Sequence, residues 1–339
     1  EHIELLSGIH QALKQALPEV GTGYAAKLRA ETIQADPRSR LIAVAGHTLE
    51  KTTAFSLTYE AEPLDSWRAL VERPDLDLVI VANINRDHGA IARAALQAGK
   101  HVVVEYPLSL EVAEAESLID LATTQGKLLH VEHIELLSGI HQALKQALPE
   151  VGTAFYARYA TITPQHPAPE RWTYHTEQFG FPLIAALSRI HRLTDIFGPV
   201  ASVSCQNQVW PTVATSSSPY YKACICSAQL RFKTNLIADV VYGKGETFWQ
   251  ASRILEIQGD RGALIFDGDQ GILIQGEQTL PIDTGSRRGL FAKDTGMILD
   301  HLLNQAPLYV RPQASLEALK VADAARRSAE TGQTILMPA

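Results

Sequence analysis

The feature that most constrains the fold of this chain of 339 residues is a letter-for-letter internal copy. Residues 1–22 (EHIELLSGIHQALKQALPEVGT) recur without a mismatch at residues 132–153. One sequence must therefore be accommodated at two places in the structure. In the second copy, apolar residues recur at helical spacing and predict an amphipathic helix. These residues are Leu136, Leu137, Ile140, Ala143, Leu144, Ala147 and Leu148.

Between residues 21 and 152, short apolar segments alternate with helical patterns. Strands separated by helices predict βαβ units and a parallel sheet with both faces covered. The predicted strands are residues 41–45, 78–82, 101–105 and 128–131, and the clearest helices are residues 88–98 and 110–124.

After residue 153 the pattern changes to longer strands with alternating polarity, which predict a large, mainly antiparallel sheet. One face of such a sheet packs against helices and the other stays available to a ligand. A final amphipathic helix is predicted at residues 314–331 and ends at Gly332. The predicted strands are residues 155–163, 200–209, 224–233, 236–242, 254–258 and 263–267.

The predicted fold class is therefore α/β: an N-terminal Rossmann-type parallel sheet, followed by an α+β domain built on a mainly antiparallel sheet. We expect the Rossmann domain at residues 21–151 and the sheet domain at residues 152–313. We expect residues 314–339 to pack back on the Rossmann domain. Residues 1–20 form a duplicated segment whose place in this scheme is uncertain.

The composition excludes several classes of partner. A formal net charge of −7 disfavours nucleic acid and anionic membranes, and no apolar segment is long enough to span a bilayer. The three cysteines are sparse and odd in number, and we expect them to be ordinary strand residues in a reducing cytoplasm. Histidine spacing gives no closed metal site, so no metal is predicted.

A glycine-rich turn predicts a dinucleotide site. Gly21, Gly23 and Ala26 form a Gly-x-Gly-x-x-Ala pattern, which lets backbone amides at a helix N-terminus approach a pyrophosphate. Thr22, Tyr24 and Ala25 lie within the same turn.

The residues after the second predicted strand indicate which nucleotide is bound. An enzyme that uses NAD usually places an acidic residue there to hold the ribose 2′-hydroxyl. This chain has Gly46, His47 and Thr48, and the nearest carboxylate, Glu50, is followed at once by Lys51. The sequence therefore predicts NADPH in preference to NADH.

The glycine turn should follow a buried strand, but here it follows the first copy of the duplicated segment. Residues 16–20 would have to form that strand, and Pro18 cannot donate to a central ladder. We rate them a poor strand and expect the working protein to carry an ordinary apolar strand before Gly21. On this interpretation only the second copy, at residues 132–135, is functional.

Two segments resemble the Gfo/Idh/MocA oxidoreductases: residues 79–88 (VIVANINRDH) and residues 94–108 (AALQAGKHVVVEYPL). The resemblance covers most of residues 21–331. It implies that Asn83, Ile84 and His88 lie along the cofactor. It also implies that Glu105 and Tyr106 face the nicotinamide.

The chain departs from the sugar-oxidising members of that family at two motifs. Those members carry Glu-Lys-Pro, where this chain has Glu105, Tyr106 and Pro107. They also carry an acid and a histidine where this chain has Ser188 and Arg192. A permanently charged guanidinium cannot act as the base in alcohol oxidation, but it can stabilise negative charge after hydride addition. These departures favour reduction of an acidic, conjugated substrate.

Further segments resemble the biliverdin reductases, above all the cyanobacterial ones: residues 130–137, 156–159, 171–175, 178–182, 185–189, 242–246 and 285–291. This resemblance implies that hydride passes from NADPH to C10 of biliverdin IXα, giving bilirubin IXα. The implied partner is a small tetrapyrrole.

A flat tetrapyrrole with two propionates needs aromatic faces and cations. Arg189 and Arg192 lie three residues apart and are our candidates for substrate binding and for assisting protonation; for each, an ordinary ion pair is the alternative. Tyr106 and Glu105 complete the catalytic candidates, although Tyr106 could serve only in packing. The further substrate-binding candidates are Glu132, Tyr156, Trp172, Tyr174, Phe179, Lys244 and Arg288. For Glu132, Lys244 and Arg288, solvated surface charge is the alternative. Other readings are a reductase of another carbonyl or imine substrate, or a non-catalytic protein that senses NADP(H).

Overall fold

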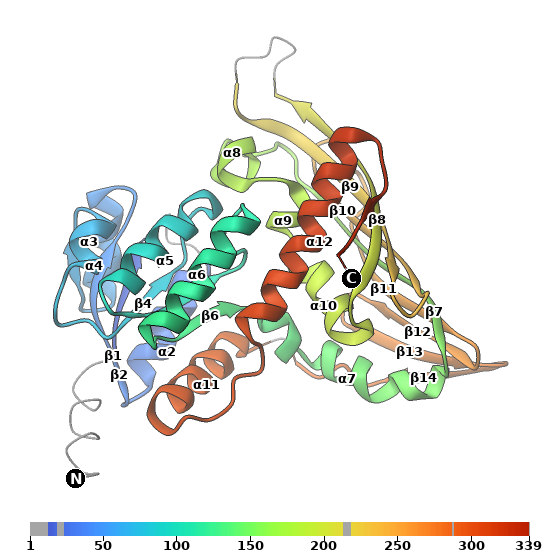
Figure 1. Cartoon of the computed structure of the whole chain (residues 1–339), viewed down its shortest axis with the longest axis horizontal. Helices are drawn as coiled ribbons and strands as arrows, with labels where there is room; N and C mark the ends of the chain where they lie inside the picture. Colours follow the sequence, from blue (N-terminus) through green and yellow to red (C-terminus); the bar gives the residue numbers. More distant parts are fainter. Residues whose placement is uncertain (1–12, 19–23, 213–217, 287, 339) are drawn as a thin grey trace. The chain divides into compact units, whose positions relative to one another are not determined.

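The computed structural model describes residues 13–18, 24–212, 218–286 and 288–338, which divide into two units (Figure 1). Unit 1 comprises the described residues up to Ile134 together with Arg288–Ser315. Unit 2 comprises Glu135 to Ser286 and Leu316 to Pro338.

Unit 1 contains parallel strands, as the alternating pattern predicted. They form two groups in the order β1-β2-β3 and β4-β5-β6. Because β1 also lies beside β4, the order is that of a Rossmann sheet, 3-2-1-4-5-6. The strands are β1 (Leu13–Pro18), β2 (Ser39–Ala45), β3 (Glu62–Leu64), β4 (Leu78–Val81), β5 (His101–Glu105) and β6 (Leu129–Glu132).

Helices accompany these strands along the chain and supply much of the core of unit 1. One of them, α11, was not predicted, and it returns from far along the sequence to pack against α2. Ile298 and Leu299 of α11 are buried in a cluster with Ala30 and Ile33 of α2. The helices are α2 (Tyr24–Ala35), α3 (Leu49–Thr58), α4 (Trp67–Val71), α5 (His88–Gln97), α6 (Val112–Gln125) and α11 (Leu290–Asn304).

Unit 2 is built on a nine-stranded sheet in the order β14-β13-β12-β11-β7-β10-β9-β8-β15. Its one parallel pair is β7 with β10, and the other pairs are antiparallel, which confirms the mainly antiparallel prediction. The strands are β7 (Ala154–Pro164), β8 (Val200–Pro211), β9 (Tyr221–Phe232), β10 (Ile237–Gly245), β11 (Ser252–Gly259), β12 (Gly262–Asp267), β13 (Gln270–Gln275), β14 (Gln278–Ile282) and β15 (Ile335–Leu336).

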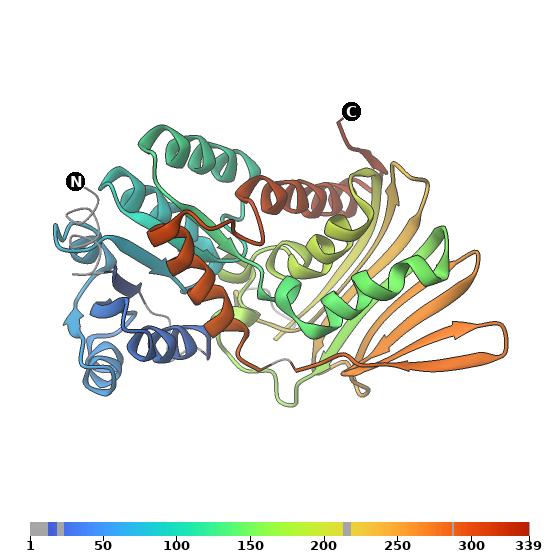
Figure 2. The same ribbon diagram turned by 90° about the horizontal axis from the view of Figure 1, so that it is seen from below.

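Three of the helices of unit 2, α7, α10 and α12, lie along one face of this sheet (Figure 2). Strand β9 shows the matching pattern, because its alternate residues from Cys226 to Phe232 are buried and the residues between them are exposed. The helices are α7 (Gly139–Ala147), α8 (Thr176–Phe179), α9 (Pro182–Ala185), α10 (Ser188–Phe197) and α12 (Pro312–Thr331).

The division between the units differs from the predicted domains. The chain leaves unit 1 at Ile134 rather than at Val151, so α7 belongs to unit 2. The final helix also belongs mainly to unit 2, where the hydroxyl of Ser328 accepts a hydrogen bond from the backbone of Cys205. The element that returns to the Rossmann unit is α11. The prediction went wrong because amphipathicity shows that a helix has an apolar face, but not which sheet that face covers.

The expectation that the working protein carries a different strand before Gly21 stays a prediction. The rating of this part of the first copy as a poor strand differs from the structure. The structure has a strand there, β1, which pairs in parallel with β2 from Leu13↔Ser39 to Pro18↔Ala45. The pairing contains a register shift between Gln15 and Ala16. Pro18 is the last residue of the strand, where its missing donor costs least. A strand therefore does precede the glycine turn, formed by the sequence that is helical in the second copy.

Candidate functional site

The carboxyl ends of β4 and β5 bring together the residues predicted to lie along a cofactor. Asn83 and Ile84 follow β4, and both side chains are at least nine-tenths buried. His88, at the start of α5, is buried with Nδ1 at 2.7 Å from the carbonyl oxygen of Pro107 and Nε2 at 3.0 Å from that of Asn83. His88 therefore links the loop after β4 to the loop after β5.

Two carboxylates lie directly opposite each other at this edge of the sheet. Glu105 ends β5 and Glu132 ends β6, and the two are paired across the strands. Glu132 is 1% exposed and accepts a hydrogen bond of 2.5 Å from the backbone of Ile134. Burial raises the pKa of Glu132 well above its ordinary value, and the charge of Glu105 raises it further. The surroundings of Glu132 therefore favour its protonated form.

A buried arginine holds the other side of this pair. Arg29, on α2, lies 3.3 Å from Glu105 Oε1 and donates to Thr295 Oγ1 at 2.9 Å. Arg29 also forms an ion pair with Asp294 of α11, and Asp294 in turn lies 2.9 Å from Nε2 of His130.

The charge of Arg29 is maintained despite complete burial. Burial opposes it, but Asp294, Glu105 and Glu132 outweigh burial and raise the pKa of Arg29 above its ordinary value. Sequence reasoning missed both Arg29 and Asp294. The signal that could have revealed them is that each is a charged residue with apolar neighbours on its helix.

Tyr106 follows Glu105 and stacks on His133, with ring centroids 5.3 Å apart and planes 5° from parallel. His133 is buried, and its Nε2 lies 2.8 Å from the hydroxyl of Ser315. Its backbone N–H donates to the hydroxyl of Tyr309. Tyr106 is therefore held at the sheet edge by His133, whose ring and backbone are each fixed by a hydrogen bond.

The remaining predicted cofactor residues follow β1 and β2 in the sequence. Gly21, Thr22 and Gly23 are outside the described residues, whereas Tyr24 begins α2 and Ala25 follows it. Gly46, His47 and Thr48 follow β2, and Thr48 caps α3 by accepting from the backbone of Lys51. His47 and Thr48 are exposed, with no acidic residue at the strand end itself.

In unit 2, three predicted aromatic residues come together around Lys244. Trp172, Tyr174 and Phe179 lie on a 3-10 turn and on α8, and the Trp172 and Phe179 rings are 6.1 Å apart. The ammonium of Lys244 lies 3.4 Å from the ring centroid of Phe179 and 4.7 Å from that of Tyr174. Such distances are those of cation–π contacts.

Two tyrosines that the sequence analysis did not assign complete this cage. The rings of Tyr221 and Tyr242 lie 5.4 Å and 5.9 Å from the same ammonium. Tyr242 and Lys244 are two residues apart on β10, so they share a face of the sheet. That spacing was the signal that could have revealed Tyr242.

The structure corrects the view of Lys244 as a solvated loop cation. Lys244 lies on β10, is 6% exposed and donates to the carbonyl oxygen of Thr173. Burial lowers its pKa to about 7. Lys244 therefore holds the aromatic cage together from inside.

The two arginines of α10 have different environments. Arg189 is half-buried, lies over the ring of Tyr242 at 5.3 Å and donates to the hydroxyl of Ser188. Arg192 is buried and donates to the carboxylate of Glu135 at 2.8 Å. The structure therefore favours the ion-pair alternative for Arg192, whereas Arg189 joins the aromatic cluster.

Two further substrate candidates are not brought to this cluster. Tyr156 donates to the carboxylate of Asp239, and both residues lie on the face of the sheet opposite Tyr242. The reason is the strand period of two, which places Tyr156 and the buried Thr161 on opposite faces of β7. Arg288 is exposed and belongs to unit 1.

No group of three or more His, Cys, Asp or Glu side chains among the described residues could hold a metal ion. No helix among these residues is both long and apolar enough to cross a membrane.

Family models match both parts of the chain. Residues 20–133 match the model of the oxidoreductase family with an NAD-binding Rossmann fold, and residues 145–337 match the C-terminal alpha/beta domain of the same family. The chain therefore belongs to the Gfo/Idh/MocA oxidoreductase family.

Among solved structures, the chain is similar to a biliverdin reductase from Synechocystis sp. PCC 6803, solved with biliverdin and NADP+. The two are 52% identical with a TM-score of 0.90, and the match covers 94% of this chain and 99% of that chain.

Among curated proteins, biliverdin reductase A of mouse is 29% identical over 55% of this chain, and that of human is 35% identical over 38% of it. These matches span 59% and 41% of the two relatives. A levoglucosan dehydrogenase, at 17% identity and a TM-score of 0.82, shares the fold.

Proposed function

We propose that this chain is an NADPH-dependent biliverdin reductase, which adds hydride to C10 of biliverdin IXα and releases bilirubin IXα. The observation that carries the proposal is the 52% identity to the Synechocystis biliverdin reductase over 94% of the chain. The resemblance extends through both units, so it includes the residues proposed to hold each reactant.

The residues at the carboxyl edge of the unit 1 sheet fit a nicotinamide dinucleotide. Asn83 Oδ1 is buried and has no hydrogen-bond partner among the described residues, which suits a donor supplied by the cofactor. The polar Gly46, His47 and Thr48 after β2 place no carboxylate where a 2′-phosphate would lie. When bound, NADPH would supply the hydride.

Glu105 and Tyr106 would border the nicotinamide. Arg29 fixes the Glu105 carboxylate from behind, and burial favours the protonated form of Glu132. A proton on Glu132 would limit repulsion of the cofactor's phosphates. Tyr106, stacked on His133, would form an apolar wall that excludes water.

In unit 2, Arg189 would stabilise the electron density that hydride addition places on the pyrrole nitrogens. Its guanidinium has a pKa too high to act readily as an acid, so an ordered water held by it would deliver the proton. Trp172, which is only half-buried, would offer an aromatic face to the bilin, and the buried Tyr174 and Phe179 would support it from around Lys244. Arg192, paired with Glu135, would position α10 and so orient Arg189.

The direct test mixes the full chain with NADPH and biliverdin and follows the absorption spectrum. We expect loss of the long-wavelength bilin band with the appearance of a bilirubin band. NADPH binding without any spectral change would refute the substrate. Turnover of a different carbonyl or imine compound in place of biliverdin would assign another reductase activity.

Changing Arg189 tests whether its positive charge stabilises the electron density that hydride addition leaves on the bilin. Arg189→Ala should lower kcat/KM by roughly 100-fold to 1,000-fold, as loss of a positioned charge-stabilising group does. The matched control is Arg158→Ala on β7, an exposed arginine on the opposite face of the sheet, which should leave kcat/KM unchanged. Equal kcat/KM in Arg189→Ala and the wild type would show that Arg189 has no part in the reaction.

A further inference from the structure

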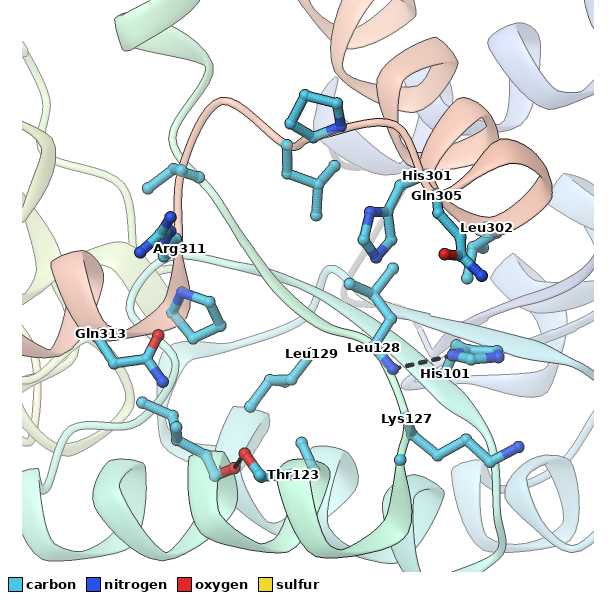
Figure 3. Close-up of a pocket in the computed structure, with 17 residues that line it drawn as sticks. His101, Thr123, Lys127, Leu128, Leu129, His301, Leu302, Gln305, Arg311 and Gln313 are labelled. Atoms are coloured by element: carbon cyan, nitrogen blue, oxygen red, sulfur yellow. Dashed lines mark hydrogen bonds between the residues drawn. The ribbon is translucent and has the colours of Figure 1, made fainter.

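A pocket lies in unit 1, at the starts of β5 and β6 (Figure 3). Its volume is about 730 Å³. It includes His101 and Leu129, the first residues of β5 and β6, whereas Glu105 and Glu132 end the same two strands. Ligands of open parallel sheets bind at the carboxyl ends of the strands, so this pocket is separate from the cofactor site.

Aliphatic side chains form much of the wall. Leu128 and Leu129 lie in the middle of the pocket, between the ends of α6 and α11 (Figure 3). Leu302 and Leu308 come from α11 and from the segment after it. A pocket of this size with an apolar wall is typical of small organic ligands.

The charged residues of the pocket have one sign. Lys127 and Arg311 carry positive charge, and none of the described residues that line the pocket is acidic. Burial, together with the charges of Lys127 and His301, lowers the pKa of His101 to about 4. The local potential is therefore positive, and an anion would relieve it.

Two donors on this side of the pocket are available to such an anion. The backbone N–H of Leu128 donates to Nδ1 of His101 at 2.9 Å, so the proton of the neutral ring is on Nε2, which can donate to a ligand (Figure 3). Lys127 Nζ has no hydrogen-bond or ion-pair partner in the described part of the chain. Lys127 is half-buried and lines the pocket.

We propose that this pocket binds an amphipathic organic anion, a carboxylate on a short aliphatic body. The carboxylate lies between Lys127 and the Nε2 donor of His101, and the aliphatic body packs on Leu128, Leu302 and Leu308. An inorganic anion leaves the apolar wall exposed to water, and a neutral aliphatic molecule leaves Lys127 without a counter-charge. Only a molecule with both parts satisfies the whole pocket.

The test titrates octanoate into the full chain by calorimetry, with NADPH at saturation so that the cofactor site is filled. We expect one binding site, tighter binding of decanoate than of hexanoate, and no measurable binding of octanol. Lys127→Gln should weaken octanoate binding by about tenfold to a hundredfold, and Lys127→Arg should restore most of it. Lys233→Gln, which removes an exposed lysine of unit 2, is the matched control and should bind as the wild type does.

Several outcomes would overturn the proposal. They are unchanged octanoate affinity in Lys127→Gln, equal affinity for inorganic phosphate and octanoate, or equal affinity for octanol and octanoate. An NMR measurement on the wild type does not depend on how the variant folds. Octanoate should shift the ring resonances of His101 and leave those of His166, in unit 2, unchanged; absence of the His101 shift would refute the site.

Discussion

The same six residues, LKQALP, form a strand in one region of this molecule and helical turns in another. At residues 13–18 they are β1, paired in parallel with β2. At residues 144–149 they end α7 and enter a 3-10 turn. Because the two sequences are identical, intrinsic propensity cannot account for the difference. Tertiary surroundings decide it.

The surroundings differ in what each offers the backbone and the side chains. At residues 13–18, β2 offers a row of backbone partners and β4 lies on the other side. In the second copy, Ser138 caps α7 by accepting from the backbone of His141, and Ile140, Ala143 and Leu144 are buried. A helix with a cap and an apolar face to bury is the stable choice there. The register shift in β1 shows the less regular fit of the two.

The largest expected effect comes from giving both copies a strand sequence. Replacing residues 13–18 by VVIVVG should stabilise unit 1 by about 5 kcal/mol, because a strand inside a parallel sheet favours large apolar side chains, each contributing roughly 1.5–3 kcal/mol. The same replacement at residues 144–149 should destabilise unit 2, because it removes the turn that ends α7. Chemical denaturation measures the change in the free energy of unfolding of each variant. A loss of stability in both would contradict the conclusion that the first copy favours a strand.

A smaller effect is expected from the close approach of α7 to a neighbouring loop. A Cβ added to Gly139 would lie 2.0 Å from the backbone oxygen of Thr284, so Gly139→Ala should cost about 1–3 kcal/mol in the free energy of unfolding. Gly296→Ala, in α11, is the control: a Cβ there meets nothing within 4 Å. The control should be neutral or stabilising by up to about 1 kcal/mol. Equal melting temperatures for the two variants would show that the contact between Gly139 and Thr284 does not hold α7 in place.

The pH dependence of stability should reveal how α7 is anchored to α10. Asp195 accepts a hydrogen bond of 2.9 Å from His141, and this bond lowers the pKa of Asp195 to about 2. Because the folded pKa lies below the unfolded value of about 3.9, the stabilisation is present above pH 4. It is lost as the pH falls towards 2.

Asp195→Asn should therefore lower stability at pH 7 by about 1 kcal/mol, a figure reduced for solvent screening because Asp195 is 29% exposed. It should also remove part of the acid-dependent loss between pH 4 and 2. A wild-type pH profile retained in the variant would exclude this anchor.

The smallest expected effect is the sharpest test of secondary structure. Gln146 is exposed on α7, and Gln146→Ile should destabilise the protein by about 0.5 kcal/mol through lower helix propensity. The matched change in the first copy, Gln15→Ile, should stabilise by a similar amount, because β-branched residues favour strands. Equal shifts of the same sign would indicate that the two copies share one conformation.

Much of the fold could be predicted from hydrophobic periodicity. Strand β5 was predicted with the bounds the structure shows, and α5 and the strands β7 to β12 within a few residues. Strands β13, β14 and β15 were not predicted. Helix α11 was missed, and α12 was assigned to the wrong unit. Periodicity reports that an apolar face exists, whereas the partner of that face depends on residues distant in sequence.

The candidate site divides in the same way. Motifs located Asn83, His88, Glu105 and Arg189, because these positions follow strands or lie on one helical turn. They did not reveal Arg29 of α2, which forms ion pairs with Glu105 and with Asp294 of α11. A buried ion pair joins residues hundreds of positions apart, so local sequence carries no trace of it.

The sequence by itself determined the fold class, the order of the two units and the membership of an oxidoreductase family. Each of these depends on local patterns: strand and helix periods, and motifs read along a few residues. Only the tertiary structure decided which conformation the duplicated segment takes in each place. The two copies have the same intrinsic propensities for helix and strand. The difference between these propensities is smaller than the stabilisation from backbone pairing and side-chain burial at each location.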